Sequence, residues 1–286
     1  MMRKILVAGS AGQLGKCVLR ELKRRGYAVR ALARDAGRLN KVEADEVVTA
    51  DLTRPETLRG VCDSVDAVIS CAGASMNFNN FGDRKSFYEI DHHGNLNLLA
   101  EAKKAGVKKF VYVSLANADS LRQTEYADAH EKFVDELRSS GLDHTVVRPT
   151  GFFGFHLEIL KFANKGRGLL IGSGGSRTNP IHESDVAAAC VDALEKSEGE
   201  LIVGGPDVFT RRETVELAFA SVRRKPSLLS VSPWMFKLMI SPLKLINPRI
   251  HALLDFGVAV TQIDVLAPKF GSERLSNYFE VAAKEL

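Results

Sequence analysis

Tyr126 and His130 stand four residues apart in the segment EYADAHEKF, which covers residues 125–133. Four residues make about one turn of an α-helix, so a helix would place the phenol and the imidazole on one face. Both groups can exchange protons with a substrate, which is the chemistry of general acid–base catalysis. Lys132 follows Tyr126 by six residues, about 240° around such a helix, and is expected to point away from it.

The imidazole is a weak partner for the phenol at neutral pH. An unperturbed histidine, with a pKa of about 6.5, is mostly neutral and does little to lower a phenol pKa of about 10. His130 could instead relay a proton. The segment is polar, and Phe133, Val134 and Leu137 would form the apolar face of an amphipathic helix. The alternative interpretation is therefore that Tyr126 lies at the exposed start of this helix and has no catalytic role.

A glycine-rich turn near the N-terminus is the second chemical signal. KILVAG, residues 4–9, has the continuous apolar run of a strand buried in a parallel sheet. A helical pattern over residues 16–26 follows, and YAVRALAR, residues 27–34, predicts the next strand. Glycines at such a strand–helix turn let backbone amides approach a pyrophosphate. The predicted phosphate-binding residues are Gly9, Ser10, Ala11, Gly12, Gln13, Leu14 and Gly15.

The spacing G-x-x-G-x-x-G in this turn resembles the short-chain dehydrogenase/reductase superfamily, in particular its extended and NmrA-like atypical branches. The likeness covers nearly the whole chain, and its specific motifs lie before residue 155. In that superfamily an acid at the end of the second strand holds the ribose of NAD and would repel a 2′-phosphate. This position falls on Ala33, and Arg34 follows with a guanidinium that can bind phosphate. Arg38 or Lys41 could add charge, so we expect NADP(H) as the preferred cofactor and NAD(H) as the other candidate.

The resemblance also implies the remaining site residues. Catalytic members carry a serine after the fifth strand, then a tyrosine, and four residues later a lysine that lowers the pKa of the tyrosine. Ser114, Tyr126 and His130 fall on these positions, so a histidine replaces the lysine. The other implied cofactor contacts are Asp51 and Leu52 beside the adenine, Cys71, Ala72 and Gly73 after the fourth strand, and Pro149 after the sixth.

A long predicted helix over residues 86–107 contains two alternative acids, His92 and His93. Adjacent residues on a helix point about 100° apart, so at most one of them could face the site. Each is more often a packed or solvated helix residue than a catalyst. The neighbouring Asp91 stands where many extended members of the superfamily carry asparagine.

Strands and helices alternate along the chain, which predicts an α/β fold with a doubly wound parallel sheet of Rossmann type. Ligands on such sheets lie beyond the carboxyl ends of the strands. We predict a dinucleotide-binding domain of residues 1–155 with about 177–205, and a small C-terminal substrate cap of residues 156–176 and 206–286. A capping box, Thr210 with Glu213, starts a helix in the cap. The predicted strands cover residues 4–9, 27–34, 46–52, 66–73, 108–115 and 144–154.

Length and composition exclude several classes of protein. The 286 residues are 45% hydrophobic and 26% charged, with no low-complexity tract or internal repeat, which excludes a disordered chain or a solenoid. The start, MMRKILVAGS, has too short an apolar run for a signal peptide, and no run of 18 apolar residues exists. We expect a cytoplasmic protein without a metal, whose cysteines are free thiols: Cys17, Cys62, Cys71 and Cys190.

The net charge of +4 is unevenly distributed. Residues 217–254 carry six bases and no acid, so this segment has a charge of +6 and the remainder −2, which argues against a general nucleic-acid binder. Three prolines divide residues 227–260 into short helices. These helices are expected to cover an apolar pocket as a mobile lid, or to pack on the domain. A further hypothesis is peripheral contact with an anionic membrane through about residues 227–250, where Trp234, Phe236, Leu238 and Ile240 accompany the bases.

The leading functional hypothesis is an NADP(H)-dependent oxidoreductase that acts on a carbonyl or conjugated double bond of a small apolar substrate. Tyr126, Ser114 and His130 would supply or orient the proton. The absence of the family lysine favours a first alternative, a non-catalytic NmrA-like protein that senses NADP(H). A nucleotide-sugar epimerase is the second alternative, and it is disfavoured because such enzymes keep the tyrosine–lysine pair.

Overall fold

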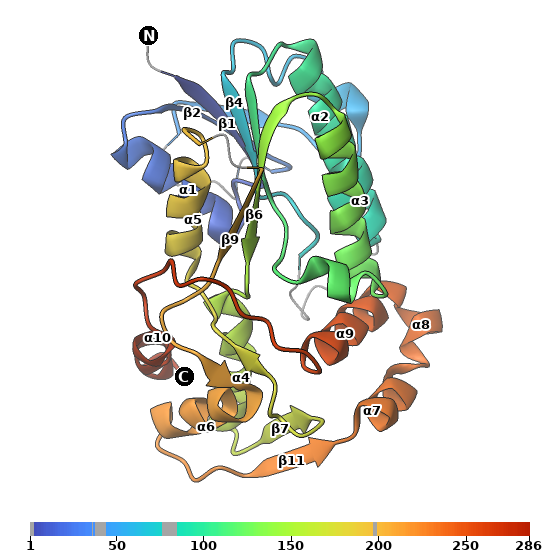
Figure 1. Cartoon of the computed structure of the whole chain (residues 1–286), viewed down its shortest axis with the longest axis vertical. Coiled ribbons are helices and arrows are strands. Elements are labelled where there is room, and N and C mark those ends of the chain that lie inside the picture. The colour runs from blue at the N-terminus through green and yellow to red at the C-terminus, as the bar shows by residue number, and fades with distance from the viewer. Residues whose placement is uncertain (1–2, 36, 38–43, 76–84, 197–198) are drawn as a thin grey trace.

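The computed structural model describes residues 3–35, 37, 44–75, 85–196 and 199–286 of the chain. Its centre is a seven-stranded sheet in which every neighbouring pair is parallel, in the order β3-β2-β1-β4-β5-β6-β9 (Figure 1). The strands are β1 (Lys4–Ala8), β2 (Ala28–Ala33), β3 (Glu46–Thr49), β4 (Ala67–Ser70), β5 (Lys109–Val113), β6 (Asp143–Pro149) and β9 (Glu200–Val203).

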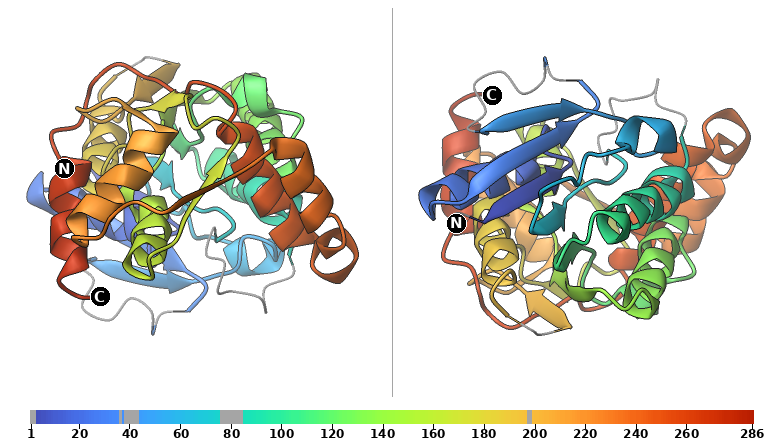
Figure 2. Two further views of the ribbon diagram at one scale, coloured as in Figure 1. Left: turned by 90° about the horizontal axis from the view of Figure 1, so that it is seen from below. Right: turned by 90° about the horizontal axis from the view of Figure 1, so that it is seen from above.

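Helices cover both faces of this sheet, which confirms the doubly wound fold (Figures 1 and 2). In β1, Ile5 and Val7 pack into one layer of the core, and Leu6 and Ala8 pack into the other; none of the four is exposed. A central strand of a doubly covered sheet buries both sides, so it shows a continuous apolar run rather than alternation. The flanking helices are α1 (Gln13–Arg24) and α5 (Glu183–Asp192) on one face, and α2 (Asn95–Lys104) and α3 (Glu125–Ser139) on the other.

Each of the six predicted strands overlaps an observed strand. The segment assigned to the sixth strand runs to residue 154, with Arg148 and Pro149 expected to end the strand, and β6 does end at Pro149; helix α4 (Phe153–Asn164) begins before the segment is over. Between them Gly151 has a φ of +153°, and the Phe153 amide bonds to the carbonyl of Ile181 instead of extending the sheet. Strand β9 was not predicted, because it has only four residues and its apolar run is limited to Leu201, Ile202 and Val203.

The helix predicted over residues 86–107 is not regular. Its first part, η3 (Tyr88–Gly94), is a π-helical segment, and α2 continues from Asn95. A π-helical turn leaves backbone carbonyls without their usual α-helical partners. The buried amide of Asn95 bonds to the carbonyls of Asp91 and Ile90, at 3.0 and 3.5 Å, and also to that of Ala72. These bonds attach the wide turn to the loop that follows β4.

The C-terminal part adds two small sheets, β10 with β8 and β11 with β7, around a second apolar core. The predicted capping box of Thr210 and Glu213 is confirmed, and prolines stand in the first turn of two helices, as expected of residues that begin short helices. The division into two domains stays a prediction. The elements are β7 (Gly168–Ile171), β8 (Arg177–Thr178), β10 (Phe209–Thr210), α6 (Arg211–Ser221), β11 (Leu228–Val231), α7 (Pro233–Ile240), α8 (Leu243–Ile246), α9 (Pro248–Val260) and α10 (Leu275–Ala283); short 3-10 turns are η2 (Pro55–Leu58) and η4 (Ala118–Leu121).

Candidate active site

A cavity of about 830 Å³ extends from the carboxyl ends of the central strands to the C-terminal elements. At one end it is lined by the glycine turn after β1, and at the other by α4 and α9. The leading candidates for cofactor contact and catalysis all line this cavity except Ser10. The cavity therefore joins the expected cofactor contacts and the expected proton donors in one space.

The glycine turn has the shape that a dinucleotide pyrophosphate needs. A Cβ on Gly9, whose φ is +75°, would lie 2.7 Å from the carbonyl group of Cys71. A Cβ on Gly15 would lie only 2.2 Å from the oxygen of Gly9, so α1 can pack closely on the turn. No side chain caps the N-terminus of α1 at Gly12. Its first-turn amides are thus free to receive an anion, and the residues present fit a bound dinucleotide.

Ser10 is the exception among the predicted residues. It is fully buried, and its hydroxyl donates to the carbonyl of Leu32 at 2.8 Å. This bond ties the glycine turn to the last residues of β2. Ser10 therefore stabilises the turn by bonding it to β2 and does not line the cavity, whereas Ala11, Gly12 and Gln13 do.

Arg34 and Asp35 lie side by side in the chain at the end of β2, and both are exposed at the cavity. No ion pair or hydrogen bond engages the Arg34 side chain within the described structure, so its guanidinium is available for a phosphate. Sequence reasoning overlooked Asp35, whose Oδ1 accepts a bond from the Gly37 amide at 2.8 Å. Its carboxylate is the feature of this rim that would suit a ribose hydroxyl. Arg38 and Lys41 lie outside the described residues.

Asp51 and Leu52 line the cavity beyond the end of β3. Burial raises the pKa of Asp51, but bonds from Thr53 and the ammonium of Lys85 outweigh it and bring the pKa to about 2. This carboxylate is therefore ionised and held in place. Beyond β4 and β6, the cavity is lined by Cys71, Ala72, Gly73 and Pro149. As expected, the four cysteines are free thiols.

Tyr126 stands in the first turn of α3, and its partly buried ring lies against the aromatic rings of three neighbours. Ring centroids are 5.1 Å from Phe87, 4.7 Å from His130 and 4.6 Å from Phe256 of α9, all in edge-to-face geometry. Burial raises the pKa of Tyr126 above that of a free phenol, and the charge of Asp91 adds to this effect. The hydroxyl has no hydrogen-bond partner among the described residues. A phenol in this state is a proton donor, not a base.

The ring nitrogens of His130 face other residues than Tyr126. Its Nδ1 lies 2.6 Å from the hydroxyl of Tyr112, and its Nε2 lies 3.3 Å from Asp91 Oδ1. Burial, helped by the charge of Arg148, lowers the pKa of His130 to about 3. Burial raises the pKa of Asp91 to about 7, although its oxygens accept bonds from the Ala74 amide. The imidazole is thus neutral. Its Nδ1 bonds to Tyr112, whereas its Nε2 lies near Asp91 without a hydrogen bond within the described structure.

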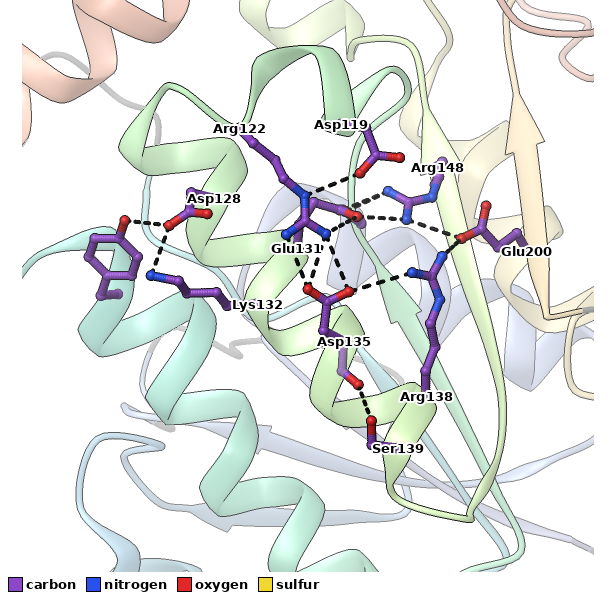
Figure 3. A network of polar contacts seen from close by, with 12 residues as sticks. Asp119, Arg122, Asp128, Glu131, Lys132, Asp135, Arg138, Ser139, Arg148 and Glu200 are labelled. Atoms are coloured by element: carbon purple, nitrogen blue, oxygen red, sulfur yellow. Dashed lines mark hydrogen bonds and ion pairs between the residues drawn. The ribbon is translucent and has the colours of Figure 1, made fainter.

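Ser114 is bound to a buried ion pair of Glu131 and Arg148, both labelled in Figure 3. Its hydroxyl donates to Glu131 Oε1 at 2.8 Å and receives a bond of 3.3 Å from Arg148 Nη1. Arg148 donates from Nη1 and Nη2 to the two carboxylate oxygens of Glu131, at 2.6 and 2.9 Å, and its Nη2 also donates to Glu200 of β9. Because its proton is committed to Glu131, Ser114 can offer the cavity only an acceptor oxygen.

Lys132 does not replace the missing lysine, as the helical periodicity predicted. Its ammonium pairs with Asp128 at 3.0 Å and lies over the ring of Tyr88, away from the cavity (Figure 3). His92 and His93 are also absent from the cavity lining, whereas Asp91 is part of it. The wide turn η3 directs Asp91, not the two histidines, toward the site.

Five further ionisable residues of the cavity were missed by sequence reasoning: His156, Glu158, Lys161, Glu183 and Arg211. Glu183 is buried, one of its oxygens has no partner, and burial raises its pKa. His156 belongs to α4, and Arg211 is the first residue of α6. No sequence signal marks these positions, because they meet the cavity only through the packing of distant segments. The described residues contain no group of three or more potential metal ligands.

Comparison with known protein families identifies one that covers most of the sheet domain. A family described as NAD(P)H-binding matches residues 9–197. The chain is also 28% identical, over 329 aligned positions, to a chloroplastic divinyl chlorophyllide a 8-vinyl-reductase of Arabidopsis thaliana. That alignment covers 98% of this chain and 77% of the relative.

Two solved structures share the fold over nearly their whole length. An NADPH-dependent quinone oxidoreductase from Escherichia coli, complexed with NADPH, superposes with a TM-score of 0.79 at 19% identity, covering 97% of this chain and 99% of that one. A UDP-glucose 4-epimerase from Thermotoga maritima, with UDP-glucose, gives 0.72 at 18% identity, covering 98% and 97%. At such identities these structures show the fold alone.

Proposed function

This chain belongs to the NAD(P)H-binding family, and on that premise we propose that it is an NADP(H)-dependent oxidoreductase. It transfers a hydride to or from a carbonyl or conjugated double bond of a small, mainly apolar substrate. The observation that carries this proposal is the single cavity that runs from the glycine turn past Tyr126 to the C-terminal elements. One end fits the dinucleotide, and the other end has apolar side chains from α4 and α9, including Leu157, Leu253 and Phe256.

In the proposed reaction the bound nicotinamide supplies or receives the hydride, and the chain supplies the proton. Tyr126 is the proposed proton donor in the direction of reduction, because its hydroxyl is protonated and uncommitted. Hydride and proton together add two electrons and two hydrogens across a C=O or C=C bond. Ser114 accepts a hydrogen bond beside it, and His130 positions Tyr126 through ring contact. The proton reaches Tyr126 again from solvent after each turnover.

The names of the relatives support this class of substrate. One is called a vinyl-reductase and another a quinone oxidoreductase, so one name refers to a carbon–carbon double bond and the other to a conjugated dicarbonyl. Both groups accept a hydride when they are conjugated. The largely apolar far half of the cavity fits such a molecule better than a sugar.

The first test of the proposal is a calorimetric titration with NADPH and NADH. The wild type is expected to bind NADPH more tightly, and Arg34→Ala is expected to weaken NADPH about 10- to 100-fold while NADH changes little, since one charged hydrogen bond is lost. Arg59→Ala, an exposed arginine away from the cavity, is the matched control. Equal affinities would overturn the NADP(H) preference, and no binding of either dinucleotide would overturn the whole proposal.

Catalysis separates an enzyme from the rival interpretation, a protein that only senses NADP(H). Oxidation of NADPH in the presence of apolar enones or quinones is expected, and Tyr126→Phe should lower turnover at least about 100-fold without weakening NADPH. Tyr27→Phe, which removes a hydroxyl bonded to exposed Glu195, serves as control. NADPH binding without turnover of any such acceptor would favour the sensor. NAD retained through purification would favour an epimerase, whose fold this chain shares.

We also propose that the exposed apolar surface of α7 and α8 contacts an anionic membrane. Six of its large side chains are at least half exposed: Trp234, Met235, Leu238, Met239, Leu245 and Ile246. Residues 217–254 contain no acid, although Arg249 does not contribute to the surface, because it is buried and donates to the carbonyl of Ser75. Within the described residues, no helix is long and apolar enough to cross a bilayer. A cytoplasmic location remains our proposal.

A further inference from the structure

Arg211 is a cation that faces the cavity without a counterion. Its Nη2 donates to the carbonyl of Val260 at 2.9 Å, and its Nε is buried without any partner. No acid among the described residues forms an ion pair with it. Asp264, whose charge acts on Arg211, is itself paired with Arg177 at 2.8 Å. A guanidinium removed from water in this way is stabilised when an anion reaches it.

His156 provides a second polar group beside Arg211. Its Nδ1 lies 2.9 Å from the carbonyl of Phe152, and since a carbonyl can only accept, Nδ1 carries the proton. Burial, helped by the nearby charge of Arg211, lowers the pKa of His156 to about 4, so the ring is neutral and Nε2 is a bare acceptor. Within the described structure Nε2 has no partner. An anion bound to Arg211 would cancel the unfavourable charge and favour protonation of this nitrogen.

The distance along α9 relates this polar corner to the proposed proton donor. Phe256 packs against Tyr126, and Val260, whose carbonyl holds Arg211, follows one helical turn later. One turn rises about 5.4 Å, so the points on α9 that contact Tyr126 and Arg211 lie about one turn apart. The cavity wall near this turn includes Leu253, Gly257 and Val265.

We infer that the substrate of the proposed reductase carries a carboxylate, which Arg211 binds while the reacting carbon lies beside Tyr126. Lys161 of α4 also lines the cavity, but it pairs with Glu158 at 2.7 Å. Arg211, which has no acidic partner in the described part of the chain and lies next to a neutral imidazole, suits a single negative charge on an apolar body, whereas a phosphate dianion would call for more positive charge. This inference rests on the proposed function, because it assigns the far end of the same cavity.

The test uses octanoate as the probe and octanamide as its neutral analogue. NMR titrations of the protein saturated with NADP⁺ are expected to give at least about tenfold tighter binding of octanoate. Arg211→Leu should abolish this difference, Arg211→Lys should retain part of it, and neither should change the affinity for NADPH. The imidazole signals of His156 should titrate at higher pH when octanoate is bound.

Equal binding of octanoate and octanamide to the wild type would overturn the inference, even if the Arg211→Leu variant failed to fold. So would unchanged octanoate binding by a folded Arg211→Leu variant. Failure of the proposed function is distinguishable, because it appears as loss of NADPH binding or turnover, while the carboxylate preference can still be measured on the protein without dinucleotide. Weakened NADPH binding by Arg211→Leu would assign the cation to the cofactor and reject this inference.

Discussion

The protonation states around Tyr126 differ from those of the tyrosine–lysine pair in the superfamily that the sequence resembles. Lysine would bring a permanent charge next to Tyr126, but His130 is neutral and contacts Tyr112 and Asp91 instead. Without a nearby cation the phenol keeps its proton, because burial raises its pKa. At the scale of single residues the site is therefore suited to protonating a reduced substrate, not to removing a proton from an alcohol at neutral pH.

The buried carboxyl of Asp91 predicts a measurable pH dependence of stability. In the unfolded chain it loses its proton near pH 4, but in the folded state its pKa is about 7. Between these values the folded state binds more protons, so the Asp91 contribution to stability falls by up to about 1.4 kcal/mol for each unit of rising pH. Relative to the wild type, Asp91→Asn should thus gain stability as the pH rises from 4 to 7, and then level off.

Urea unfolding at half-unit intervals of pH measures this difference. Asp119→Asn is the control, because the Asp119 side chain is 84% exposed, and its difference from the wild type should stay flat. Subtracting the curves removes the contributions of titrating groups that are distant from Asp91. His130 lies 3.3 Å from Asp91 and has an opposing contribution, so the difference reports on the two groups together. A difference between Asp91→Asn and the wild type that falls as the pH rises would show that Asp91 is ionised in the folded state.

At the scale of elements, the position of α1 against the end of β1 decides whether the phosphate site exists. Gly15 permits this approach, because a side chain at this position would occupy the space of the Gly9 carbonyl. The close contact brings the uncapped first turn of α1 to the cavity. The wide turn η3 has a similar role, because it brings Asp91 to the loop after β4.

Gly15→Ala is expected to weaken NADPH binding and to lower the free energy of unfolding by about 1–3 kcal/mol, since the added methyl group meets only backbone atoms. Calorimetry and urea unfolding give the two quantities. Gly257→Ala in α9 is the control: nothing lies within 4 Å of its added methyl group, and stability should rise by about 0.5–1 kcal/mol. Unchanged NADPH affinity in Gly15→Ala would refute the phosphate role of the turn.

At the scale of the whole molecule, α9 joins the C-terminal elements to the sheet. It packs against α3 through Phe256 and Tyr126, and its Arg249 reaches the loop after β4. The adjoining α7 and α8 project on the opposite side from α10 (Figure 1). Lys237 of α7 is paired with Asp255 of α9 at 2.9 Å, so the apolar side chains are the main feature of this surface. An apolar surface adjacent to the cavity wall would let an apolar substrate enter from a membrane.

Vesicle co-sedimentation tests this orientation. The wild type should sediment with vesicles containing phosphatidylglycerol, less so at high salt, and not with pure phosphatidylcholine. Leu245→Ser combined with Ile246→Ser should reduce binding, since these side chains are 91% and 70% exposed. Val281→Ser on α10, 60% exposed in the wild type, is the matched control. Absence of lipid-dependent sedimentation at low salt would end the membrane proposal.

The sequence by itself determined the sheet, the glycine turn and the capping of α6, because each depends on residues close together in the chain. A continuous apolar run such as that around Ile5 specifies a doubly buried strand, and Gly9 and Gly15 specify the turn through local sterics. The rotation of Lys132 away from Tyr126 followed from helical geometry alone.

Only the tertiary structure decided which partners the polar residues have. His130 and Ser114 are matched by spacing to catalytic positions, but their hydrogen bonds go to Tyr112 and to Glu131. Arg211 donates to the carbonyl of Val260, 49 residues further along the chain, and has no acidic partner among the described residues. Contacts of this kind are set by how separate elements pack, and no local pattern encodes them. The pKa values follow from the same packing, since burial is the largest cause for Tyr126, His130 and Asp91.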